Sequence, residues 1–152
     1  MYHRVLYFVD RDLDLALAER AQGFLLHTPA ELSPICAQLE DRMRVRGYPL
    51  KDIFAVSLAL REAVINAYQH GHRCDPAKSI YLRYAVTDDE VLLEVEDQGP
   101  GFAPEGLPTP FFGEKRDRTG GRGLLLMSAF TTWMSFNRPG NRVTLVKQRS
   151  RD

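Results

Sequence analysis

Hydrophobic residues recur every three or four positions along residues 50–70, which is the strongest helix pattern in the chain. The apolar positions of this pattern are Ile53, Val56, Leu60, Ala63, Val64 and Ala67. An earlier helix is expected to begin after Thr28, where Pro29 and Glu31 complete a helix-start signal, and to end near residue 45, before Gly47-Tyr48-Pro49. Shorter helices are predicted over residues 11–22 and 124–130.

Strands are predicted where β-branched and aromatic residues cluster or alternate with polar ones. The predicted strands cover residues 3–9, 24–27, 80–86, 91–96, 133–136 and 142–147. Turn sequences at 87–90 and 137–141 join two pairs of these strands into hairpins. Together the elements predict an α+β fold, a two-layer sandwich with helices packed on one face of a mixed, largely antiparallel sheet.

The 152 residues suit one domain of ordinary size, and 20 basic residues balance 20 acidic ones. This balance argues against direct binding of nucleic acid, because nucleic-acid-binding domains usually carry a basic excess. No apolar run approaches the roughly 20 residues that span a bilayer, and the N-terminus lacks a signal-peptide pattern, so no membrane partner is expected. Cys36 and Cys74 show no metal-ligand spacing, which favours two free thiols in the cytoplasm.

Glu62 and Asn66 stand four residues apart, on one face of the helix predicted over 50–70. A carboxylate and an amide on a mostly buried helix need partners. Glu62 is therefore a candidate general base, and Asn66 is a candidate ligand of Mg²⁺, which binds through few protein oxygens plus phosphates. The alternative is that both side chains face solvent at the helix edge. His70 is either a contact at the helix C-terminus or a ligand.

Asp97 directly follows a predicted strand and opens a glycine-containing segment. Gly99 and Gly101 allow the backbone to approach a ligand closely, so Asp97 is a candidate acceptor for an adenine amino group. The alternative interpretation is a plain surface turn, where Asp and Gly are also common.

Gly121 and Gly123 stand just before the helix predicted over 124–130. Free backbone N–H groups and the helix dipole favour a phosphate at such a place, whereas the alternative is a flexible loop end. The preceding stretch, at about 102–120, is long enough to be a lid. It contains three basic residues that could each reach a phosphate, and the sequence does not choose among Lys115, Arg116 and Arg118.

In this order the three clusters resemble the superfamily of gyrase, heat-shock chaperone, histidine kinase and MutL ATPases (GHKL). The matching motifs are E-x-x-x-N-A-x-x-H-G from Glu62, D-x-G-x-G-F from Asp97 and G-x-G-L from Gly121. Within the superfamily, roughly residues 24–149 look like the anti-sigma-factor serine kinases of bacterial partner-switching systems. The resemblance implies a Bergerat-type ATP-binding fold in a kinase-like domain over residues 23–152, after an N-terminal extension over 1–22 of unknown role.

The resemblance also implies roles for individual residues. Glu62 matches the general base, Asn66 the Mg²⁺ ligand and Asp97 the acid that reads adenine. The other residues matched to ATP binding are Gly99, Gly101, Phe102, Gly121, Arg122, Gly123 and Leu124. The implied cofactors are ATP and Mg²⁺.

The chain departs from the family pattern in three places. Gly140-Asn141 replaces the Gly-Thr that often opens the last strand, which puts an adenine contact from that threonine in question. Thr131-Thr132 stands where the family often has an acidic residue, and residues 1–22 have no evident counterpart.

The implied function is that of an ATP-dependent serine/threonine protein kinase in the cytoplasm, which regulates like an anti-sigma factor and phosphorylates a small antagonist protein. A sigma factor and a second copy of the chain are further partners that the resemblance suggests. One alternative is an ATP-binding regulatory switch without phosphotransfer activity. Others are a detached histidine-kinase catalytic domain, for which the N-terminal part is too short to hold the phosphoacceptor hairpin, and an unrelated α+β interaction domain.

Overall fold

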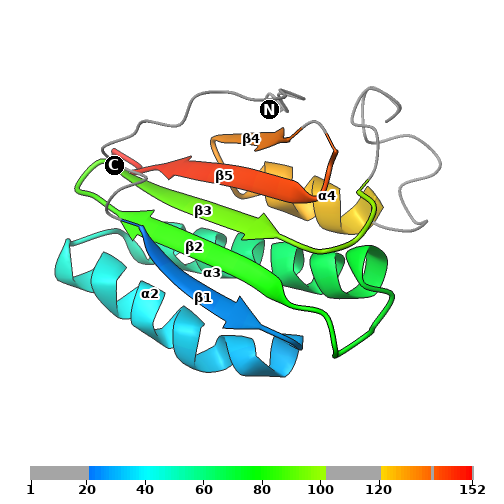
Figure 1. The fold of residues 1–152 in the computed structure, drawn as a ribbon. Helices are drawn as coiled ribbons and strands as arrows, with labels where there is room; N and C mark the ends of the chain where they lie inside the picture. Colours follow the sequence, from blue (N-terminus) through cyan, green and yellow to red (C-terminus); the bar gives the residue numbers. More distant parts are fainter. Residues whose placement is uncertain (1–20, 102–120, 138, 152) are drawn as a thin grey trace.

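The structure, a computed structural model, describes residues 21–101, 121–137 and 139–151 (Figure 1). The elements in chain order are β1 (Gln22–Leu26), the 3₁₀ helix η1 (Pro29–Leu32), α2 (Ser33–Val45), α3 (Leu50–Asn66), the π-helical turn η2 (Ala67–Gly71), β2 (Ile80–Val86), β3 (Glu90–Glu96), α4 (Gly121–Ala129), β4 (Trp133–Phe136) and β5 (Arg142–Gln148). The strand and most of the helix predicted before residue 21, the lid and Phe102 lie outside these ranges.

The five described strands form one sheet in the order β1-β2-β3-β5-β4, and every pairing among them is antiparallel. Helices α2 and α3 lie on one face of this sheet, and α4 lies beside α3 (Figure 1). The predicted α+β arrangement of two layers is therefore confirmed. No helix in the described ranges is long and apolar enough to cross a membrane.

The core lies between the sheet and the helices because alternate strand residues point toward α2 and α3. On β3 these are Val91, Leu93 and Val95, which join one large buried cluster with helix residues such as Leu60. Leu92 points to the opposite face, where a small second cluster contains Ala85 and Val146. The alternation thus fixes which face of the sheet receives the helices.

The helix predicted from residue 29 to about 45 is interrupted. Thr28 precedes the short 3₁₀ helix η1, and a new helix, α2, begins at Ser33. Pro34 explains the break, because its ring has no N–H to donate and would clash with the carbonyl four residues earlier in a continuous α-helix. The Thr28 side chain makes no capping bond; instead Glu31 Oε1 accepts the His27 N–H at 3.2 Å.

Two other helix boundaries differ from the prediction. Gln22 pairs with Tyr84 as the first residue of β1, so the helix predicted to continue to residue 22 does not include it. Sheet pairing overrides the local helical pattern there. Helix α4 begins at Gly121, three residues earlier than predicted, which places the glycine cluster inside its first turn.

Candidate functional site

Glu62 and Asn66 lie one turn apart in the last part of α3, and both are half-buried. The neighbouring core positions Ala63 and Val64 are fully buried against the sheet, which fixes the rotation of the helix about its axis. Within the described ranges, neither Glu62 nor Asn66 makes a side-chain hydrogen bond or an ion pair with another residue. Both candidate roles require oxygen atoms that a ligand can reach, and neither side chain is fully buried.

The helix does not continue as an α-helix after Asn66. The residues from Ala67 to Gly71 form a π-helical turn, closed by the His72 N–H donating to the Ala67 carbonyl at 2.9 Å. Arg73 and Cys74 then adopt left-handed backbone conformations, with φ of 51° and 62°, and reverse the chain. Single π-helical turns are frequent at functional sites.

The π-helical turn presses against the segment that follows β3. A Cβ atom added to Gly71 would overlap the Asp97 carboxyl group, and one added to Gly99 would overlap the Gly71 carbonyl oxygen. The Gly99 N–H donates to Asp97 Oδ1 at 2.7 Å. Residues from two of the three sequence clusters therefore meet in direct contact, and only glycine fits at the two positions between them.

Asp97 is also held from the side of β5. Its N–H donates to the Asn141 carbonyl at 2.9 Å, and Asn141 Nδ2 donates to the Asp97 carbonyl at 3.1 Å. Asn141 is oriented in turn by Asn137, whose Oδ1 accepts the Asn141 N–H at 3.0 Å. The asparagine that departs from the family pattern is therefore a structural support of Asp97.

Gly101 has a φ of +75°, which favours glycine, and a Cβ there would overlap the Pro139 carbonyl oxygen. The turn between β4 and β5 thus packs directly on the segment that carries Asp97. This close approach accounts for the second glycine of the strand-end motif.

Burial has the largest effect on the pKa values of the two titratable groups where these segments meet, Asp97 and His72. It raises the pKa of the Asp97 carboxyl above its ordinary value, although the Gly99 N–H and the nearby His72 act in the opposite direction. Burial also lowers the pKa of the His72 imidazole, so the neutral ring is favoured. A half-buried carboxyl beside a neutral ring is suited to accept a hydrogen bond from a neutral donor such as an amino group on a base.

The first turn of α4 is formed by Gly121, Arg122 and Gly123, so the glycines predicted to precede a helix are within it. The first four N–H groups of a helix have no partner inside the helix, which leaves this turn able to donate to an anion. The start of α4 lies on the same side of the molecule as the ends of α3 and β3 (Figure 1). The side chains of Arg122 and Leu124 lie outside the described part.

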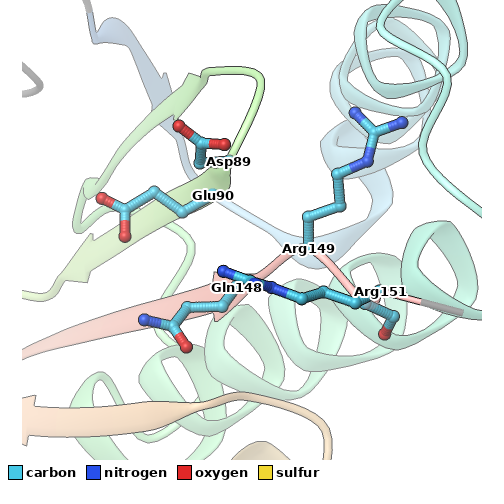
Figure 2. A pocket seen from close by; sticks show the side chains of 6 residues that line it. Asp89, Glu90, Gln148, Arg149 and Arg151 are labelled. Atoms are coloured by element: carbon cyan, nitrogen blue, oxygen red, sulfur yellow. The ribbon is translucent and has the colours of Figure 1, made fainter.

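A polar pocket of about 560 Å³ lies elsewhere, at the opposite end of β3. Its lining residues are Asp89, Glu90, Gln148, Arg149, Ser150 and Arg151. Figure 2 shows that Arg149 points away from Asp89 and Glu90. Its guanidinium donates to the carbonyls of Arg46 and Gly47 and stacks over the Tyr48 ring. These contacts give Arg149 a structural role, remote from Asp97.

Three residues at the site were not predicted as site residues from the sequence. The sequence pointed to Gly71, because this glycine is the last residue of the helix motif. It gave no indication for His72 and Asn141 beyond their nearness to the motifs. Their positions depend on how the end of α3 and the β4–β5 turn pack around Asp97, which spacing along the chain does not reveal.

A two-layer fold of this topology, with a Glu/Asn helix beside a strand-end Asp-x-Gly-x-Gly segment, defines an ATPase domain of the Bergerat type. The family model for the histidine kinase-like ATPase domain matches residues 25–147. The chain therefore belongs to the histidine kinase-like ATPase domain family, and an ATPase domain implies ATP binding.

Curated relatives include anti-sigma factors and serine-protein kinases. The chain is 30% identical over 83 residues to the anti-sigma F factor of Clostridium perfringens (strain SM101 / Type A), a match covering 53% of this chain and 59% of that protein. It is 31% identical over 87 residues to the serine-protein kinase RsbW of Bacillus subtilis (strain 168), covering 53% and 54% respectively. The chain thus spans somewhat over half the length of these relatives.

A solved structure has the same fold. The crystal structure of the RsbU and RsbW domains of Rv1364c from Mycobacterium tuberculosis superposes with a TM-score of 0.56 at 21% sequence identity. The match covers 85% of this chain and 32% of that one. At this identity the likeness concerns the fold alone.

Proposed function

We propose that this protein is an ATP-dependent serine/threonine protein kinase that controls a partner protein by phosphorylating a small antagonist. The observation that supports it most is the packing of Gly71 and Gly99 around Asp97, at the end of the helix that carries Glu62 and Asn66. The candidate base-reading carboxyl of Asp97 and the candidate catalytic carboxylate of Glu62 are thus carried by adjoining segments, which supports the proposal. The names of the curated relatives favour protein phosphorylation and sigma-factor control as its context.

The residues present fit an ATP-bound Mg²⁺ ion. The described residues contain no cluster of three or more His, Cys, Asp or Glu side chains that would hold a metal by themselves. Asn66 offers one oxygen, and Mg²⁺ typically combines one or two protein ligands with water and substrate phosphates. When bound, the ion would neutralise charge on the transferred phosphoryl group.

The chain's own residues would divide the remaining work. Asp97 would accept a hydrogen bond from the adenine amino group, and the N–H groups at the start of α4 would donate to the phosphates. Glu62 would accept the proton of the attacking serine or threonine hydroxyl while that oxygen bonds to the γ-phosphorus. The bond from the γ-phosphorus to the bridging oxygen breaks, and ADP leaves.

The test separates nucleotide binding from phosphotransfer. ATP binding is measured by titration calorimetry with and without Mg²⁺, and transfer is measured as phosphoserine or phosphothreonine on small antagonist-domain proteins from the source organism. We expect Glu62→Gln to bind Mg·ATP but to lose at least about 100-fold in transfer rate, the lower range for general-base catalysis. Wild-type protein that binds Mg·ATP and modifies none of these proteins would be a nucleotide-dependent switch instead.

A further inference from the structure

His72 follows the π-helical turn and is almost completely buried, with 1% of its surface exposed. Its Nε2 accepts the Gln98 N–H at 2.8 Å. Gln98 lies between Asp97 and Gly99, so this bond joins the end of α3 to the backbone of the segment that carries the candidate base-reading carboxyl. The proposed phosphotransfer assigns no role to His72 or to this hydrogen bond.

The bond defines the state of the imidazole ring. Because Nε2 accepts a hydrogen bond, the proton of the neutral ring lies on Nδ1. Among the described residues, Nδ1 is the buried side-chain polar atom that has no hydrogen-bond partner. A buried polar atom without a partner costs about 1–3 kcal/mol. An apolar side chain would avoid this cost, so the feature that histidine supplies at this position is the acceptor for Gln98.

The charged groups that act on the ring come from the two segments around it. Asp97 lies on the segment after β3, and Asp75 and Lys78 lie on the loop between η2 and β2. The acidic pair favours the protonated ring, whereas Lys78 and burial oppose it. A protonated ring would have a hydrogen on Nε2 and could no longer accept the Gln98 N–H.

We propose that His72 is a positioning residue for base selectivity, which holds the Asp97 segment so that the site prefers a 6-aminopurine nucleotide to a 6-oxopurine nucleotide. This inference rests on the proposed ATP binding. The Asp97 carboxylate accepts a hydrogen bond from a 6-amino group but repels the oxygen of a 6-oxo group. Discrimination between the two bases therefore requires the carboxyl to be held at one place. Gly71 packs against the carboxyl itself, whereas Asn141 and His72 hold the backbone on which it stands, at Asp97 and Gln98.

The experiment compares ATP with inosine triphosphate (ITP), which has a 6-oxo group. Affinities for both, with Mg²⁺, are measured by titration calorimetry at pH 7.5 for wild type, His72→Phe and His72→Gln. Loss of one hydrogen bond worth about 1 kcal/mol predicts that His72→Phe lowers the ATP:ITP affinity ratio about fivefold. His72→Gln keeps an acceptor near the Nε2 position and should stay within about twofold of wild type. His27→Gln, which removes an exposed histidine whose Nδ1 lies 3.2 Å from the Lys78 carbonyl oxygen, is the matched control.

A role in packing alone predicts that His72→Phe weakens ATP and ITP equally, and this result would overturn the proposal. If His72→Phe does not fold, His72→Leu, which also lacks an acceptor, replaces it and should lower the ATP:ITP ratio to a similar extent. Equal weakening of ATP and ITP by His72→Leu would overturn the proposal in the same way. Wild type that binds ATP and ITP equally would remove the inference but leave ATP binding intact, whereas wild type that binds neither would contradict the proposed function itself.

Discussion

At the scale of single residues, Gly71 packs closely against Asp97. The φ of Gly71 is not in the left-handed region, so its backbone conformation is open to other residues. The glycine leaves space for a side chain, because the position of a Cβ atom is occupied by the Asp97 carboxyl group. The glycine therefore matters to the position of one side chain rather than to the shape of the turn.

We expect Gly71→Ala to displace the Asp97 carboxyl without unfolding the domain. The side chain can rotate away from the new methyl group, so we expect the melting temperature to change by only a few degrees. ATP affinity should fall about 10-fold, which corresponds to about 1.4 kcal/mol, the range for loss of a hydrogen bond to a charged group. Titration calorimetry and thermal unfolding on the same samples measure both quantities.

Gly23→Ala is the matched control. Its Cβ would meet the Tyr81 hydroxyl at 2.7 Å, a contact with the end of a long side chain at the edge of the sheet. We expect wild-type ATP affinity from this variant. Equal losses in the two glycine variants would show that the effect of Gly71→Ala is not specific to Asp97.

At the scale of elements, the segment that follows β5 is attached to the start of α3 through Asp52. This carboxyl is 1% exposed and accepts hydrogen bonds from the Ser150 N–H at 2.8 Å and the Ser150 hydroxyl at 2.6 Å. Lys147 Nζ lies 3.4 Å away. Burial alone would raise the pKa of Asp52, but these hydrogen bonds and the lysine charge outweigh it and hold the pKa below its ordinary value.

Asp52→Ala is expected to lower the free energy of unfolding by about 2–4 kcal/mol. The substitution leaves the Ser150 N–H, the Ser150 hydroxyl and the partly buried Lys147 ammonium without their shared partner. Urea denaturation measures the change, and Asp41→Ala, which removes an exposed carboxylate on α2, should cost less than about 1 kcal/mol. A cost for Asp52→Ala as small as that of the control would contradict the attachment.

The lowered pKa of Asp52 also gives this contribution a pH dependence. A carboxyl with a folded pKa below its unfolded value stabilises the fold at pH above the unfolded value, and the stabilisation is lost as pH falls through the folded pKa. The difference in stability between wild type and Asp52→Ala should therefore be constant from pH 7 to about 5 and shrink below about pH 4. A difference that does not change down to pH 3 would contradict this account.

The elements that were predicted correctly from the sequence have strong periodicity, and those that were not depend on tertiary contacts. The alternation in β2 and the apolar spacing in α3 are local signals, and both elements were found close to their true ends. The interruption at Ser33 and the start of β1 at Gln22 were missed. The first depends on a single proline, and the second on pairing with a strand some 60 residues away.

For the whole molecule, the candidate site follows from topology. The end of α3 and the end of β3 are about 30 residues apart in sequence, yet the fold brings Gly71 and Asp97 into contact. The motifs make Glu62, Asn66 and Asp97 candidates, because each motif is local. The supports of Asp97 from Asn141 and His72 could not be predicted, since they depend on how three separate turns meet.

A ligand that binds across these segments should stabilise the whole domain, because it binds the folded state and not the unfolded one. ATP at 100 times its dissociation constant adds about 2.7 kcal/mol, which raises the melting temperature of a domain of this size by roughly 5–10 °C. Scanning fluorimetry with ATP, Mg²⁺ and both together measures the effect. We expect the Asn66→Ala variant to lose the part of this thermal shift that depends on Mg²⁺.

Glu62→Gln provides the comparison that separates binding from chemistry. Since Glu62 is proposed to act on the hydroxyl proton rather than on the nucleotide, its amide variant should keep the full thermal shift with Mg·ATP. If Glu62→Gln loses as much of the shift as Asn66→Ala, Glu62 is a ligand-binding residue, and the general base of the proposed kinase has to lie elsewhere. A shift produced by Mg²⁺ alone, without ATP, would instead indicate a metal site independent of the nucleotide.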